Sequence, residues 1–230
     1  MTEIVREGSD AIADAFAAWR DRIDGDPRDE WRDELAARLS DGARVLELGC
    51  GNGVDARLLA ERFQVTGVDV SAEQISRARA AVPEATFIEA DFTEVELPPA
   101  SFEAVASFYV FNHVPRERLA GLLERIHEWL VPGGFLLAAF GTGDTEAWVG
   151  EWLGTTMFSV AFPRRPTRAS YAGQVFGCCL RRSLSSRNRR DRLNFSGCLQ
   201  LRREALPRAT RGCKCRRISL GGLRSRPAGR

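Results

Sequence analysis

The sequence predicts an α/β fold built on a doubly wound, mostly parallel β-sheet with helices on both faces. Short apolar runs rich in β-branched residues alternate with helix-like segments, which is typical of βαβ units with right-handed crossovers. A glycine-rich turn follows the first of these runs and leads directly into a helical pattern. Strands are expected at residues 44–48, 64–70, 86–90, 102–108 and 135–140.

Helical periodicity is expected ahead of the first strand as well as between strands. The first expected helix spans residues 3–24 and has apolar residues at steps of four, three and four: Ile12, Phe16, Trp19 and Ile23. A second, around residues 31–39, follows the break at Asp26-Pro27. Their aromatic residues have two interpretations: core packing, or a lid over a ligand cleft.

The glycine-rich turn has the pattern Gly49-x-Gly51-x-Gly53. Ligands of doubly wound sheets lie beyond the carboxyl ends of the strands, where this turn stands. A dinucleotide fingerprint would have its third glycine at position 54, which is Val54 here. The tighter spacing favours a nucleoside ligand that lacks a diphosphate.

Acidic residues end the next two expected strands. Asp69 lies 20 residues beyond Gly49, where a carboxylate can accept hydrogen bonds from both hydroxyls of a ribose. Asp91 can accept from an exocyclic amine, and Phe92 offers ring surface and a backbone amide to an adenine. Each acid alone could be a surface turn residue. Together with the glycine turn they predict one nucleoside pocket.

These motifs resemble, in order and spacing, those of class I S-adenosylmethionine-dependent methyltransferases. The resemblance covers about residues 40–158 and rests on ELGCGNG (47–53), GVDVS (67–71), EADF (89–92) and LVPGG (130–134). It implies a Rossmann-like fold, S-adenosyl-L-methionine as cofactor and methyltransferase activity.

The resemblance also implies a role for individual residues. Glu47 and the loop backbone would hold the methionine part of the cofactor, Asp69 the ribose, and Asp91 with Phe92 the adenine. Two residues after the fourth strand would line the sulfonium side. The implied cofactor-binding residues are Glu47, Gly49, Cys50, Gly51, Gly53, Asp69, Val70, Asp91, Phe92, Phe108 and Tyr109.

Methyl transfer from a sulfonium is an in-line displacement, so a general base is needed only for an acceptor that is protonated. His113, after the fourth strand, is the candidate for that base; the alternative is a loop histidine that caps the following helix. The loop lacks the Asn/Asp-Pro-Pro-Tyr/Phe motif of enzymes that methylate base or glutamine amino groups. We therefore expect a small-molecule acceptor. Cys50 is interpreted as a small spacer, not a nucleophile.

Charge divides the chain near residue 158. Residues 1–158 contain 29 acidic and 14 basic side chains, whereas residues 159–230 contain 2 acidic and 19 basic side chains. Five of the six cysteines also lie in the second part. We expect three segments: N-terminal helices on the lid or substrate side (1–40), the cofactor-binding core (41–158) and a basic, Arg/Cys-rich tail (159–230).

The tail does not resemble the family, whose fold continues with a helix and an antiparallel pair of strands. It has three interpretations. It could be a basic arm that binds nucleic acid, with the core as scaffold, or a metal cluster, although its cysteine spacing matches no Cys-x₂-Cys zinc pattern. The third, which we favour, is out-of-frame translation, since charge and periodicity change together. It predicts missing or disordered C-terminal strands and lost activity.

The sequence contains few signals that indicate a cellular location. The N-terminus is acidic and lacks the basic and apolar regions of a signal peptide, and the apolar runs are too short to span a bilayer. A cytoplasmic location with free thiols and no membrane partner is expected. No resident metal is expected, and the sequence does not predict an oligomeric state.

Overall fold

The computed structural model describes residues 1–20, 28–141, 143, 145–162 and 176–181, and the last of these ranges only by its backbone. Most of the tail therefore lies outside the described residues, and so do the nucleic-acid, metal-cluster and disorder predictions made for it. Within the tail the structure describes the last residue of one strand, Ser159, and a second strand over Phe176–Arg181, which is an apolar run.

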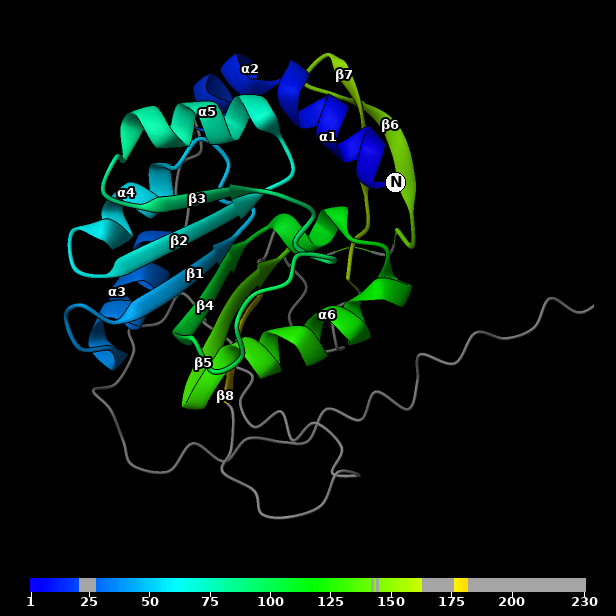
Figure 1. Cartoon of the computed structure of the whole chain (residues 1–230). Helices are drawn as coiled ribbons and strands as arrows, with labels where there is room; N and C mark the ends of the chain where they lie inside the picture. The colour runs from blue at the N-terminus through cyan, green and yellow to red at the C-terminus, as the bar shows by residue number, and fades with distance from the viewer. Residues whose placement is uncertain (21–27, 142, 144, 163–175, 182–230) are drawn as a thin grey trace, which may run out of the picture.

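The main sheet has the strand order β3-β2-β1-β4-β5-β8 (Figure 1). Strands β1 to β5 are parallel neighbours, and β8 pairs antiparallel with β5. The predicted α/β class with a mostly parallel sheet is confirmed. The strands are β1 (Arg44–Leu48), β2 (Gln64–Asp69), β3 (Thr86–Glu89), β4 (Phe102–Phe108), β5 (Leu130–Phe140) and β8 (Phe176–Arg181).

Two apolar clusters cover the two faces of this sheet. Helices α3 (Arg28–Arg38), α4 (Val54–Ala60) and α5 (Ala72–Ala81) pack on one face, and α6 (Arg116–Trp129) packs on the other (Figure 1). Val45 joins the first cluster and its neighbour Leu46 the second. This alternation follows from the two-residue period of a strand that is buried on both faces.

The N-terminal helix differs from the prediction of one continuous helix over residues 3–24. The structure breaks it at Ile12 into α1 (Thr2–Ala11) and α2 (Ala13–Arg20). The break lets α1 pack beside α5 and β7 (Figure 1), whereas Phe16 and Trp19 of α2 contact Trp152 at ring separations of 6.0 and 5.5 Å. A straight helix could not serve both contacts.

A hairpin of β6 (Trp148–Trp152) and β7 (Thr155–Ser159) stands beside α1 (Figure 1). Asn112, in the short helix η1 (Val110–His113), bonds to the chain before the hairpin and to the chain after it. Its amide nitrogen donates to the carbonyls of Gly141 (3.2 Å) and Val160 (2.7 Å), and its oxygen accepts from the Gly141 amide (2.8 Å). The hairpin is thereby fixed to the loop that follows β4.

Replacing Gly8 with alanine is expected to destabilise the docking of α1. A Cβ atom there would lie 2.8 Å from the Thr156 carbonyl oxygen and 2.9 Å from the Met157 methyl carbon. Such overpacking costs about 1–3 kcal/mol, which outweighs the gain of roughly 0.5–1 kcal/mol that alanine brings to a helix. Urea denaturation measures the change. The matched control is Gly121→Ala in α6, where the new Cβ meets open space; a Gly8→Ala chain as stable as this control would contradict the close contact.

Candidate functional site

The predicted residues meet at one edge of the sheet, because the carboxyl ends of parallel strands lie together. Glu47 of β1 pairs in register with Gly67 of β2 and with Ala106 of β4. Asp69 ends β2 and pairs with Glu89, two residues before Asp91. The structure thus brings the glycine loop, the two acids and the loop after β4 to the same edge.

The glycine loop has a left-handed backbone that only glycine adopts readily. Gly49 and Gly51 have φ angles of 69° and 52°, and Gly53, at the N-cap of α4, has 82°. A Cβ atom on Gly49 would lie 2.2 Å from a methyl carbon of Val110, so the loop passes directly against η1. This close approach brings the loop backbone and the start of the β4 loop together.

Cys50 occupies the interior of this loop. Its side chain is buried, and a Cβ atom on Gly67 would lie 2.8 Å from its sulfur. Burial raises the pKa of the Cys50 thiol well above its ordinary value, and the charge of Asp69 raises it further. A buried thiol of this kind is a poor nucleophile at neutral pH. Its environment is that of a small spacer.

Asp69 is half-buried and faces the glycine loop. One carboxylate oxygen accepts from the Gly51 amide at 2.9 Å and the other from the Ser71 amide at 3.0 Å. Burial raises the pKa of Asp69, while these two backbone hydrogen bonds oppose the increase. Each oxygen keeps lone pairs that could accept a hydroxyl. Val70, the next residue, is also half-buried.

Asp91 lies at the end of β3 beside α1. One oxygen accepts from the Thr93 amide (2.8 Å) and hydroxyl (2.6 Å), and the other accepts from the Thr2 hydroxyl (2.9 Å). Burial alone would raise the pKa of Asp91, but these hydrogen bonds and the nearby Arg118 lower it below its ordinary value. Asp91 is therefore a carboxylate at neutral pH. The Phe92 ring is buried in the cluster on the α6 face.

Glu47 is buried at the end of β1, and its Oε2 atom has no hydrogen-bond partner within the part of the chain that the structure describes. Burial raises the pKa of Glu47 well above its ordinary value, the charge of Asp55 raises it further, and Arg20 and Arg28 lower it. The hydroxyl of Ser107 and the indole nitrogen of Trp31 are likewise buried without a partner among the described residues. An unpaired buried oxygen is costly unless a ligand satisfies it.

Glu47→Gln is expected to change how stability depends on pH. The folded chain holds the Glu47 proton over a pH range in which the unfolded chain, whose glutamate pKa is about 4.3, releases it. Stability of the wild type should therefore fall as pH rises from about 4.5 toward the raised pKa. The glutamine of the variant does not titrate. The free energy of unfolding of Glu47→Gln should therefore rise relative to that of the wild type, by up to about 1.4 kcal/mol per pH unit. Urea denaturation of both proteins across this pH range measures the difference.

Glu103→Gln provides a control of opposite sign. The Glu103 carboxylate forms a hydrogen bond and an ion pair with Arg44, and both lower its pKa. Glu103→Gln should therefore be less stable than the wild type at pH values above the ordinary glutamate pKa. A Glu47→Gln difference that stays constant or shrinks as pH rises would contradict a raised pKa of the buried Glu47.

Side chains from the N-terminal helices enter this site, and sequence reasoning assigned them no role. Asp55, in the first turn of α4, accepts from Arg20 Nη2 at 2.7 Å and Arg32 Nη1 at 2.5 Å, and Arg28 Nε lies 4.0 Å away. Asp55 and Arg28 are buried, with only 6% and 7% of their side-chain surfaces exposed. The pairs link residues more than 20 positions apart and leave no local pattern. The one available signal was Asp55 itself, an acid at the helix start next to the glycine loop.

Phe108 ends β4, Tyr109 follows it, and both pack against the N-terminal segment. The Trp31 ring stacks on Phe108 with centroids 5.9 Å apart and an interplanar angle of 9°. Tyr109 has a φ of 68°, and the Arg28 guanidinium lies 4.9 Å from its ring centroid. Trp31 is buried, which agrees with its interpretation as a core residue, and its ring contacts both Phe108 and Tyr109.

His113 ends η1 and is half-buried. Its Nδ1 lies 2.7 Å from the carbonyl oxygen of Phe158, which can only accept, so Nδ1 carries the proton. Burial lowers the pKa of His113, which keeps the ring neutral and leaves Nε2 as its basic nitrogen. The alternative that His113 caps the following helix is wrong. The N-cap of α6 is Pro115, without a side-chain capping bond.

Among the described residues, no three His, Cys, Asp or Glu side chains gather as metal ligands would. The same part of the chain contains no helix long and apolar enough to cross a membrane.

Comparison with known sequences finds methyltransferases similar to the core. Residues 45–134 match the model of a methyltransferase domain. Trans-aconitate 2-methyltransferase from Rhodopseudomonas palustris is 40% identical over 114 residues, which cover 46% of this chain and 41% of that protein. An uncharacterized methyltransferase of Mycobacterium tuberculosis is 39% identical over 95 residues, which cover 40% and 47%. The chain spans less than half the length of these relatives.

Comparison with solved structures identifies the same fold. DhpI, in a complex with SAH, matches with a TM-score of 0.58 at 23% identity over 72% of this chain and 81% of that one. A TehB-like SAM-dependent methyltransferase from Corynebacterium glutamicum matches with a TM-score of 0.52 at 24% identity, over 58% and 74%.

Proposed function

We propose that this chain binds S-adenosylmethionine and methylates a small molecule, because residues 45–134 match the model of a methyltransferase domain and the chain aligns with methyltransferases at 40% and 39% identity. The observation that carries the proposal is the Asp69 carboxylate, which accepts the Gly51 amide at 2.9 Å. It ties the ribose-binding acid to a glycine loop whose spacing suits a nucleoside without a diphosphate.

The residues at the sheet edge fit the two ends of this cofactor. Asp69 would accept the ribose hydroxyls, and Asp91, a carboxylate held by Thr93, would accept the adenine amine. The methionine end carries an ammonium and a carboxylate group. The unpartnered Oε2 of Glu47 suits the ammonium group, and the arginines around Asp55 suit the carboxylate.

The bound cofactor would supply an already activated methyl group, so the chain mainly has to orient the reactants and exclude water. Trp31, stacked on Phe108, and Tyr109 place apolar surface at the start of the β4 loop. His113 would accept an acceptor's proton at Nε2, because its hydrogen bond to Phe158 fixes the proton on Nδ1. A neutral imidazole at working pH is the form that this role requires.

A small-molecule acceptor is supported by the relative named for trans-aconitate. In this proposal residues 41–158 bind the cofactor, and the helices within residues 1–40 form the lid. The contacts of Thr2 with Asp91 and of Arg20 with Asp55 support the lid assignment, since each joins an N-terminal helix to the sheet edge. The buried free thiol of Cys50 suits the reducing cytoplasm, where we place the protein.

Calorimetric titration of the full chain with S-adenosylhomocysteine and, separately, with NAD tests this proposal. We expect saturable binding of S-adenosylhomocysteine and none of NAD, because the third glycine of the dinucleotide fingerprint is replaced by Val54. Binding of NAD in preference to S-adenosylhomocysteine would contradict the proposed cofactor.

A further inference from the structure

The first turn of α5 connects the ribose acid to the N-terminal helix. Ser71 is the fully buried N-cap of α5, and its hydroxyl accepts from the Gln74 amide at 3.1 Å. The backbone amide of the same residue donates to Asp69 at 3.0 Å. The orientation of the Asp69 carboxylate therefore depends on where this turn is held.

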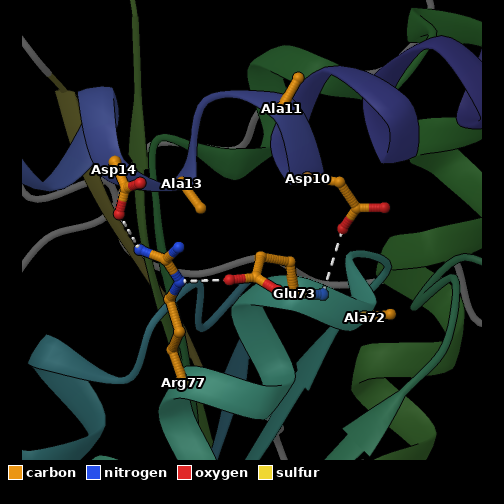
Figure 2. A pocket seen from close by; sticks show the side chains of 7 residues that line it. All are labelled: Asp10, Ala11, Ala13, Asp14, Ala72, Glu73 and Arg77. Carbon is orange, nitrogen blue, oxygen red and sulfur yellow. Dashed lines mark hydrogen bonds and ion pairs between the residues drawn. The ribbon is translucent and has the colours of Figure 1, made fainter.

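Asp10, near the end of α1, holds the turn from outside. Its Oδ1 accepts from the Ser71 hydroxyl at 2.5 Å. The same atom accepts from the Glu73 amide at 3.2 Å (Figure 2). A carboxylate at a helix N-terminus is also stabilised by the helix dipole. The side-chain amide of Gln74 adds a third bond, to the carbonyl of Ser9 at 3.3 Å. Two consecutive residues of α1 thus contact one turn of α5.

The same helix reaches the second acid of the site. The Thr2 hydroxyl, at the start of α1, donates to Asp91 at 2.9 Å. Helix α1 therefore contacts Asp91 at one end and the turn that supports Asp69 at the other. A helix placed in this way can couple its own docking to the orientation of both acids.

We propose that Asp10 is a positioning residue of the cofactor site: it fixes the first turn of α5 and thereby orients Asp69 toward the ribose hydroxyls. This inference rests on the proposed function and adds to it that the N-terminal helix sets cofactor affinity through a single carboxylate. Asp10 itself need not touch the cofactor.

Asp14 is the matched control on the adjoining helix. It lines the same open cleft of about 420 Å³ between α1, α2 and α5 (Figure 2), together with Asp10, Ala11, Ala13, Ala72, Glu73 and Arg77. Its carboxylate pairs with Arg77 at 2.6 Å, and its side chain is 93% exposed. Asp14→Ala removes the same charge from the same cleft without touching the turn that bonds to Asp69.

A double-mutant cycle between Asp10 and Asp69 tests the proposal, with S-adenosylhomocysteine affinity as the readout. In the wild-type background Asp10→Ala should weaken binding about tenfold, the equivalent of one charge-assisted hydrogen bond. In the Asp69→Asn background it should change affinity less than about twofold, since its effect passes through Asp69. Asp14→Ala should have no effect on affinity in either background.

Asp10→Asn is a second, more conservative variant for the case that Asp10→Ala does not fold. Its amide oxygen can still accept a hydrogen bond from the Ser71 hydroxyl. It should weaken binding less than Asp10→Ala does. Equal losses from Asp10→Ala in both backgrounds, or losses matched by Asp14→Ala, would overturn the positioning role even though the wild-type chain binds S-adenosylhomocysteine. The wild-type titration thus tests the proposed function separately from the role of Asp10.

Discussion

Asp69→Ala is expected to weaken S-adenosylhomocysteine binding by about 100-fold or more. Two ribose hydroxyls donating to one carboxylate contribute roughly 1.5–3 kcal/mol each, and about 2.7 kcal/mol corresponds to 100-fold in affinity. The substitution also removes the acceptor of the Gly51 and Ser71 amides, so the loop keeps only its backbone hydrogen bonds to Val68 of β2. Calorimetry on the full chain measures the change in dissociation constant.

Glu89→Ala is the control for this experiment. Glu89 is an exposed acid at the end of β3 that pairs in register with Asp69, but the proposal gives it no ligand. Its removal should change affinity less than about twofold, the range expected of an exposed charge. Equal affinity of the Asp69→Ala and Glu89→Ala chains would remove Asp69 from the cofactor site.

Gly49→Ala is expected to cost the fold about 3 kcal/mol or more. The residue has a φ of 69°, which strains any side chain, and its Cβ would lie 2.2, 2.4 and 2.8 Å from three carbons of Val110. Left-handed strain alone costs on the order of 1 kcal/mol, and overpacking adds about 1–3 kcal/mol. To relieve the overlap, the loop or η1 must move, so cofactor affinity should fall as well.

Gly42→Ala separates the two costs. Gly42 has a similar φ of 78°, but nothing lies within 4 Å of its new Cβ. Gly42→Ala should therefore lower the free energy of unfolding only by the cost of backbone strain, about 1 kcal/mol. Urea denaturation of both variants gives the comparison. Similar losses for the two would mean that the glycine loop does not press against η1.

The strands were predictable because their signal is local. Most are short apolar runs from the interior of the sheet, and the bounds of β1 and β4 agree with the prediction. Strand β5 begins five residues earlier than predicted, at Leu130, which pairs with Phe102 across an irregular register. The Val131-Pro132-Gly133-Gly134 run that follows has no strand character of its own, and the register with β4 resumes only at Phe135.

The site was predictable to the extent that strand ends carry it. Residues after parallel strands must meet, so Glu47, Asp69 and Asp91 could be assembled without knowing any contact. The arginines around Asp55 could not, because they come from helices whose docking no local pattern specifies. The bond between His113 and Phe158 depends in the same way on a hairpin placed by Asn112.

The structure of the tail could not be predicted from its sequence. Its charge and composition set it apart from the core, yet β8, within an apolar run of the tail, pairs with β5 over six residue pairs from Phe135 to Phe140. Antiparallel pairing at this edge is what the family resemblance implies for the end of the sheet. The interpretations of the remaining tail residues stay predictions.

The most direct test of the account is a crystal structure of the full chain with S-adenosylhomocysteine. We predict that both ribose hydroxyls lie within hydrogen-bonding distance, about 2.5–3.0 Å, of the Asp69 carboxylate, with the adenine amine at Asp91 and the homocysteine end toward Glu47. A ligand that leaves Asp69 without a ribose contact, or that binds away from the carboxyl edge of β1 and β2, would contradict it.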